Sequence, residues 1–283
     1  GMSKRQLLQQ LGDPSAIVRI DKQRQALFYG RKQLFSINND KVVGYQRATF
    51  VISPHLSNRI PYHDDFDSMS MTINDSISLN QTLQQVATSL NMKSPKLRNQ
   101  ALTIQSQSKT SRLNFIRKRG LYDNVNNYTL DGISVYLRGE QTFNWRNIAK
   151  KKHIKPYLDL QKSFLDSKPD LHKADVIKAL GMPTLMIEKS ATKDTWIYGD
   201  ELIVDFLRDG MLRYALESSK SKPPAPNCTQ CLYLGQSKKD IPHQYVTSRM
   251  QNQMSLESNG FSYLIAFSGQ SQRVDDIQVY VKQ

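Results

Sequence analysis

Two stretches of this chain spell the same pattern without a gap, beginning with Leu11-Gly12-Asp13-Pro14 in the first and Leu180-Gly181-Met182-Pro183 in the second. The first continues with Tyr29-Gly30, Asp40 and Tyr45, and the second with Tyr198-Gly199, Asp209 and Tyr214. Each residue of the second stretch lies 169 positions after its counterpart. A repeat at a fixed spacing predicts one structural unit built twice.

Each stretch predicts a helix followed by a meander of antiparallel strands. Apolar residues at helical spacing come first, at Leu7, Leu8 and Leu11 and again at Val176, Ile177 and Leu180. The glycine after each run supplies the left-handed conformation that ends a helix, and the proline two residues later cannot continue it. β-prone runs and hairpin turns around Asp40 and Asp209 then predict three or four strands. One helix covering one sheet face would give an α+β layer.

The whole chain is predicted to hold four such units in two pairs. The segments between the two clear copies look like degenerate copies, with helices expected over 80–91 and along Val246, Met250 and Met254. The predicted boundaries are 1–52 for the first unit, 53–160 for an irregular segment with a basic second unit, 161–217 for the third unit, and 218–283 for a linker, a Cys-x-x-Cys loop and the fourth unit. The predicted fold class is therefore α+β, with tandem helix-on-antiparallel-sheet repeat units.

The two clear copies carry a resemblance to a known family. A helix, Leu-Gly-x-Pro, a strand, an aromatic-rich strand ending in Tyr-Gly and a hairpin resemble the SmpA/OmlA small lipoproteins of the outer-membrane barrel-assembly machinery. The pattern is also similar to the tandem units of β-lactamase-inhibitor protein, and it covers less than a third of the chain. The resemblance implies a non-catalytic envelope protein that binds a protein, a lipid head group or a wall polymer. The copies differ after Tyr-Gly, where Arg31-Lys32 stands against Asp200-Glu201.

The charge of the chain bears on its partners. A net charge of +14 favours an anionic partner, namely nucleic acid, an acidic membrane surface, an anionic polymer or an acidic protein. The alternative is that the lysines only keep the protein soluble. No run of eighteen apolar residues is present, so no transmembrane segment is predicted.

The expected location follows from the resemblance. Gly1-Met2 resembles a cloning remnant, and we expect that an upstream signal peptide has been removed. The expected location is then the periplasm or the outer membrane, with or without a lipid anchor. No lipoprotein cysteine stands at the start of the sequence, and a cytoplasmic location stays open.

The candidate binding residues are basic and aromatic. The basic ones in the second unit are Arg112, Arg117, Lys118, Arg119, Arg138 and Arg146. With Phe143 and Trp145 nearby, they would suit phosphate contacts and stacking, and the run from Lys150 to Lys155 would add to a nucleic-acid surface. Tyr29 and Tyr198 alternate with apolar neighbours, so they could form an exposed aromatic row. The alternatives are a solvated sheet face for the cations and core packing for the tyrosines.

The sequence nominates no catalytic residue, cofactor or metal. Cys228 and Cys231 form a Cys-x-x-Cys pair that favours a local disulfide, with a redox dithiol, half a zinc site and two reduced thiols as alternatives. The segment from His63 to Asp67 could hold a metal through His63, Asp65 and Asp67, but it lacks the glycine and glutamate spacing of a calcium loop. An acidic loop that is only solvated is the simpler interpretation.

These observations predict a non-enzymatic bacterial cell-envelope protein that acts as a binding or scaffold module. Its expected partner is a protein or an anionic envelope component. The alternatives are a nucleic-acid-binding protein that uses the basic clusters and a hydrolase with an unrecognised site.

Overall fold

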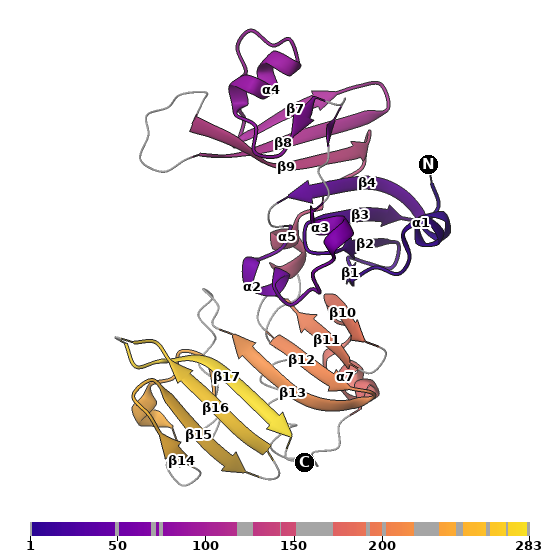
Figure 1. Cartoon of the computed structure of the whole chain (residues 1–283). Helices are drawn as coiled ribbons and strands as arrows, with labels where there is room; N and C mark the ends of the chain where they lie inside the picture. The colour runs from indigo at the N-terminus through magenta and orange to yellow at the C-terminus, as the bar shows by residue number, and fades with distance from the viewer. Residues whose placement is uncertain are drawn as a thin grey trace. The chain divides into compact units, whose positions relative to one another are not determined.

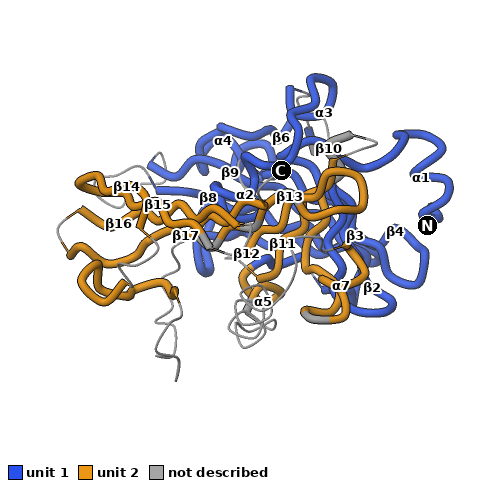
Figure 2. Tube along the Cα trace, turned by 90° about the horizontal axis from the view of Figure 1, so that it is seen from below, with its two compact units in different colours: residues 1–145 blue, residues 146–283 orange. Residues whose placement is uncertain are grey.

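The computed structural model divides the chain into two compact units, residues 1–145 and 146–283 (Figure 2). It describes residues 2–48, 51–68, 72–73, 76–117, 127–141, 143–150, 172–190, 193–199, 202–217, 232–241, 246–258, 261–269 and 271–281. The four segments expected from the sequence form a finer division, which stays a prediction.

The first unit is an antiparallel sheet with short helices on its faces (Figure 1). Its first half holds α1 (Lys4–Leu11), β1 (Ala16–Arg19), β2 (Arg24–Tyr29), β3 (Gln33–Asn38), β4 (Lys41–Ala48), α2 (Pro54–Ser57) and α3 (Asp64–Ser68). Its second half holds β5 (Thr72–Ile73), β6 (Ile77–Ser78), α4 (Leu83–Ser89), β7 (Ala101–Gln105), β8 (Lys109–Arg117) and β9 (Tyr128–Leu137). The main sheet has the order β1-β2-β3-β4-β9-β8-β7, and β5 pairs with β6 separately. Helix α5 (Trp145–Lys150) begins at the division.

The second unit repeats the same arrangement. It contains α7 (Lys173–Leu180), β10 (Leu185–Ser190), β11 (Lys193–Tyr198), β12 (Leu202–Leu207), β13 (Gly210–Glu217), the 3₁₀ turn η2 (Lys238–Asp240), β14 (Val246–Arg249), β15 (Gln253–Ser258), β16 (Phe261–Phe267) and β17 (Val274–Val281). Within this unit the strand order is β10-β11-β12-β13-β17-β16-β15-β14. The strands β10 to β13 therefore correspond to β1 to β4, and β17-β16-β15 correspond to β9-β8-β7.

The repeated motif fastens the end of helix α1 to the end of strand β2. Gly12 ends the helix with φ +77°, a backbone conformation that residues with a side chain rarely adopt. The Tyr29 hydroxyl donates to the Gly12 carbonyl oxygen at 3.0 Å, and the Gly30 N–H donates to the Ser15 hydroxyl at 3.0 Å. The Ser15 N–H in turn donates to the Phe28 carbonyl at 2.7 Å. This set of bonds places the helix against the sheet that follows it.

The second unit makes the same fastening with its own residues. Gly181 has φ +73°, and the Tyr198 hydroxyl donates to its carbonyl at 3.2 Å. The Gly199 N–H donates to the Thr184 hydroxyl at 3.1 Å, and the Thr184 N–H donates to the Ile197 carbonyl at 2.8 Å. The 169-residue repeat is therefore a repeat of hydrogen bonds as well as of residue types.

A second internal repeat lies in the strands that close each unit. Strand β9 ends with Leu130-Asp131-Gly132-Ile133-Ser134-Val135-Tyr136-Leu137, and β17 reads Val274-Asp275-Asp276-Ile277-Gln278-Val279-Tyr280-Val281. Asp131 and Asp275 each occupy the extra position where the register shifts against the neighbouring strand. Tyr136 is paired with Gly44 on β4, and Tyr280 with the corresponding Arg213 on β13. This repeat has an offset of 144 rather than 169.

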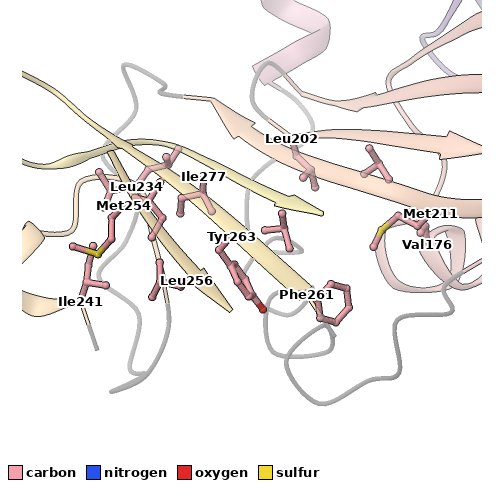
Figure 3. Packing of buried hydrophobic residues seen from close by; sticks show 14 of the residues in the cluster. Val176, Leu202, Met211, Leu234, Ile241, Met254, Leu256, Phe261, Tyr263 and Ile277 are labelled. Atoms are coloured by element: carbon pink, nitrogen blue, oxygen red, sulfur yellow. The ribbon is translucent and has the colours of Figure 1, made fainter. Parts of the chain in front are cut away.

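Apolar side chains on the helix-bearing face of each sheet make the cores. In the first unit, Leu7 of α1 packs against Leu27, Tyr29 and Ile37, while Leu83 and Val86 of α4 belong to a cluster with Leu113, Phe115 and Ile133. In the second unit one cluster extends from Val176 of α7 through Leu202 to Phe261, Tyr263 and Ile277 (Figure 3). Burial of this apolar area is the main stabilising term for each unit.

The predicted fold class is wrong. The chain is mostly β, and the segments between the clear copies do not form separate helix-on-sheet units. Strands β7 to β9 and β15 to β17 instead continue the sheets begun by β1 to β4 and β10 to β13. The described helices have at most eight residues, so each covers only part of a sheet. A sheet continued by more strands buries more apolar surface than separate small units could.

Two helices expected from the sequence differ in the structure. The helix expected along Val246, Met250 and Met254 is wrong, because these residues lie on β14, on the turn after it and on β15. Met254 and Leu256 are buried while Glu257 is exposed, which is the two-residue period of a strand. The helix expected over 80–91 is present but shorter, as α4 (Leu83–Ser89), and the Thr82 side chain caps it.

None of the described helices is both long and apolar enough to cross a lipid bilayer.

Replacing Gly12 or Gly181 by alanine is expected to destabilise the protein by about 1–3 kcal/mol, because both backbones lie in a region reserved for glycine. No atom lies within 4 Å of either added Cβ, so the effect is conformational rather than steric. Urea unfolding measures it. Gly210→Ala is the matched control, since Gly210 has an ordinary φ and room for a methyl group. Equal effects at Gly210 and Gly12 would contradict this account of the helix ends.

Candidate binding surface

The tyrosines proposed as an exposed aromatic row have a different position. Tyr29 is 1% exposed, and Tyr198 is partly buried against the core of the second unit. Their hydroxyls make the bonds to Gly12 and Gly181 described above. Burial, with the nearby negative charge of Asp13, raises the pKa of Tyr29 to about 12, and burial also raises the pKa of Tyr198. These side chains fasten helices, and neither offers a free ring to a ligand.

The predicted basic residues do not form one cluster. Arg112 lies mid-strand on β8, where its Nε donates to the Asn114 side-chain oxygen at 3.0 Å. Arg117 ends β8 opposite Tyr128, and Arg138 follows β9 at the other end of the same hairpin, where Lys109 pairs with Leu137. Eight residue steps along a strand separate these ends by about 27 Å. The two arginines therefore cannot contact one small ligand together.

The remaining predicted residues are described only in part. Arg146 is exposed on helix α5. Lys118 and Arg119 lie outside the described residues, as do Lys151 to Lys155 and the candidate disulfide Cys228–Cys231.

A long acid-free stretch supplies a larger basic surface than the predicted set. No Asp or Glu occurs between Asp75 and Asp123, whereas eight basic residues do: Lys93, Lys96, Arg98, Lys109, Arg112, Arg117, Lys118 and Arg119. The described part of this stretch forms α4, the loop after it, β7 and β8. Lys93, Lys96 and Arg98 are exposed on the loop. We call β7, β8 and β9 with α4 and this loop the basic sheet. Sequence reasoning missed the three loop residues, although the missing acids were visible.

The two faces of the basic sheet differ. Helix α4 and the apolar residues Leu90, Met92 and Leu97 cover one face, around Leu113 and Phe115 (Figure 1). The other face is open over β7 and β8, where its exposed or half-buried side chains are Thr103, Gln105, Thr110, Arg112, Asn114 and Ile116. Over β9 it is closed, because Ser134 and Tyr136 are buried. None of the exposed or half-buried side chains is aromatic, and Asp131 is the acidic residue on the three strands. This open face can donate hydrogen bonds to anionic groups but offers no ring for stacking.

The segment considered for metal binding has a structural role. Asp67 of α3 is 2% exposed, and its Oδ1 accepts the N–H groups of Arg31 and Lys32 at 2.8 and 3.0 Å. Its Oδ2 accepts the His63 N–H at 2.9 Å. Both carboxylate oxygens are thus engaged by backbone, while Asp65 points to solvent. No group of three potential metal ligands comes together in the described residues.

Arg47 completes this attachment from the sheet. It is 5% exposed, and its two Nη atoms donate to the carbonyl oxygens of Phe66 and Asp67 at 2.9 and 3.3 Å. These are the last carbonyls of a short helix, where a cation is favourable. Gly30 lies so close to Asp67 that an added Cβ would meet its Oδ2 at 2.5 Å. The segment after β4 is therefore fixed on the β2–β3 turn.

Comparisons with known proteins add little to this geometry. No family model and no curated protein matches the chain. One similar solved structure is a cysteine-rich secretory protein from Staphylococcus aureus, 12% identical over 40% of this chain and 44% of that one, with a TM-score of 0.31. Another is an extracellular protein containing an SCP domain from Bacillus anthracis, 8% identical over 51% and 49% of the two chains, with a TM-score of 0.31. The chain spans about half the length of these structures, and the likeness is too weak to carry an argument. The resemblance to SmpA/OmlA proteins stays a prediction.

Removing the Asp67 carboxylate is expected to be costly. Asp67→Ala leaves three backbone N–H groups without their acceptor, which should destabilise the protein by about 3 kcal/mol. Asp67→Asn, which keeps one acceptor oxygen, should lose less. The exposed Asp65→Ala is the control, with an expected change within about 0.5 kcal/mol. Chemical denaturation measures all three, and an Asp67→Ala protein as stable as the control would disprove the anchoring role.

The titration of Tyr29 should make the free energy of unfolding depend on pH in the alkaline range. Its folded-state pKa, about 12, lies above its ordinary value of 10.0, so the unfolded chain loses this proton first. The stability that the protonated Tyr29 hydroxyl contributes is complete below about pH 10 and is lost as the pH rises towards about 12. Urea unfolding at a series of pH values should show a shallower loss over this window for Tyr29→Phe than for the wild type. Parallel curves would show that Tyr29 titrates normally.

Proposed function

We propose that this protein is a non-enzymatic binding module of the bacterial cell envelope that recognises an anionic partner, a protein or an envelope component, through the basic sheet. The observation that carries the proposal is the acid-free stretch, which places exposed cations on β8 and on the loop before β7. Exposed cations gathered on one surface attract anionic partners and raise the rate at which the two meet.

The composition of the basic sheet supports binding rather than catalysis. No histidine or cysteine occurs between residues 76 and 141. These are common general bases and nucleophiles, and Asp131 is the single carboxylate of the three strands. A surface of this kind can hold an anionic group but has few means to transfer a proton.

The envelope location rests on the resemblance of the two clear copies to SmpA/OmlA proteins. A charged binding module would there meet acidic proteins, anionic lipids and wall polymers.

Nucleic acid is the second candidate. Its phosphates require only exposed cations, which the basic sheet supplies. The aromatic residue of this face, Tyr136 on β9, is 1% exposed, which argues against single-strand recognition by stacking on the described part of the face.

Charge reversal tests the proposed surface. Lys96→Glu/Arg112→Glu should weaken binding to polyglutamate or to phosphatidylglycerol vesicles by at least about tenfold, because favourable contacts become repulsive. Binding of the wild type should fall steeply with added salt. Fluorescence anisotropy or vesicle sedimentation measures both effects.

The control changes the net charge equally but elsewhere. Arg5→Glu/Lys22→Glu alters two exposed basic residues of the first unit outside the basic sheet. Equal losses in both double variants would mean that only net charge matters. Preferential, salt-sensitive binding of DNA over polyglutamate and vesicles would replace the proposal with the nucleic-acid alternative.

A further inference from the structure

Strand β7 has a free edge with unpaired backbone groups. It ends the sheet order of the first unit and pairs with β8 alone among the described strands. The Ser106 N–H donates to the Lys109 carbonyl and the Phe115 N–H to the Gln100 carbonyl, so the even-numbered residues on the β7 side bond to odd-numbered residues on the β8 side. By the alternation of an antiparallel pair, the N–H and C=O groups of Thr103 and Gln105 point to the outer edge.

Ala101 confirms this orientation. Ala101 is two residues before Thr103, so its backbone groups point to the same side. Its N–H donates to the Arg98 carbonyl and its C=O accepts the Arg98 N–H, both at 3.0 Å. That bridge occupies only the first position of the edge. Beyond it, Thr103 and Gln105 are paired with β8 on their inner side, and no described residue pairs with them on the outer side.

The second unit shows what this edge accepts. Strand β15 corresponds to β7 at an offset of 152. The Arg98 N–H donates to the Ala101 carbonyl, and in the second unit the Met250 N–H donates to the Gln253 carbonyl. Likewise the Phe115 N–H donates to Gln100, and the Phe267 N–H donates to Asn252. In β15 the edge is not free. Strand β14 runs antiparallel along it and pairs Ser248 with Ser255, the residue that corresponds to Thr103.

A proline stands in the first unit where such a strand would run. The residue that corresponds to Thr247 of β14 is Pro95. Proline has no N–H to donate, and Leu97 packs against the Leu113 cluster instead of continuing along β7. The residues before Arg98 therefore lie away from the edge, and no described strand occupies the position of β14 beside Thr103 and Gln105.

We propose that an extended acidic segment of a partner protein adds to β7 as an antiparallel strand, in the position that β14 occupies in the second unit. Strand addition to a sheet edge draws affinity from backbone bonds and specificity from side chains. Arg98 and Lys109 flank the edge at its two ends, and Arg112 is the cross-strand neighbour of Thr103. They belong to the stretch between Asp75 and Asp123 that contains no acidic residue, so these charges select carboxylates on the added strand. The inference rests on the proposed function, because it names the partner of the same basic sheet.

The probe is a set of synthetic peptides selected on the whole protein from a random displayed library. We expect selected peptides to be acidic and to contain a β-prone core. Hydrogen exchange of the wild-type protein should slow at the amides of Thr103 and Gln105 when such a peptide is added. Recovery of no binding peptide, or protection confined to other residues, would overturn strand addition.

Thr103→Pro removes one outward N–H without touching the bonds to β8, a position where proline is tolerated. It should weaken peptide binding by at least about tenfold. Thr103→Val, which keeps the N–H, is the matched control and should bind within about twofold of the wild type. Thermal unfolding of both variants shows whether the fold is retained, and Gln105→Pro repeats the test if Thr103→Pro is not folded.

The outcomes separate this inference from the proposed function. Loss of binding with Lys96→Glu/Arg112→Glu but not with Thr103→Pro or Gln105→Pro would keep the basic surface and reject strand addition. Peptide binding that resists both charge reversal and the proline variants would reject both.

Discussion

The fastening between a helix end and a strand end is the constraint on which each unit depends. Gly12 and Gly181 turn the chain back, and the hydroxyls of Tyr29 and Tyr198 hold that turn by its carbonyl oxygen. Each helix is too short to be stable alone, so its apolar stripe contributes only when the helix is fixed over the sheet. Leu7 and Val176, both nearly inaccessible to solvent, are the residues that this fastening places in the cores.

The corresponding sheets tolerate different buried chemistry. In the first unit the Tyr136 ring lies over Gly44, where an added Cβ would come within 2.2 Å of it. In the second unit the paired position is Arg213, whose Nε donates to the buried carboxylate of Asp205 at 2.6 Å. The Asp205 carboxylate and its hydrogen bonds raise the pKa of Arg213, although burial opposes this. One backbone thus accepts either a glycine beneath a tyrosine ring or a paired charge, because the residue opposite on the preceding strand changes too, from Ser36 in the first unit to Asp205 in the second.

The sequence predicted the parts whose signals are local. The helices at Lys4–Leu11 and Lys173–Leu180 and the strands after them follow from stripes, glycines and turns that act within a few residues. The fold class was wrong because the second repeat has offsets of 144 and 152, so the strands that extend each sheet did not align with the 169-residue pattern. The anchor at Asp67 was hidden for another reason. Its partners at Arg31 and Lys32 lie 36 and 35 residues away, and only tertiary structure brings them together.

The basic sheet was predicted in part, because single arginines on β8 were visible but their spread over the hairpin was not.

The difference between the two units is more informative than any one of these residues. An exposed strand edge invites pairing with other chains, and proteins usually cover, shorten or charge it. The second unit covers β15 with its own β14. The first unit places Pro95 where that covering strand would run, keeps β7 short and surrounds it with cations. Those features repel another copy of the same basic edge while leaving it open to a strand of opposite charge.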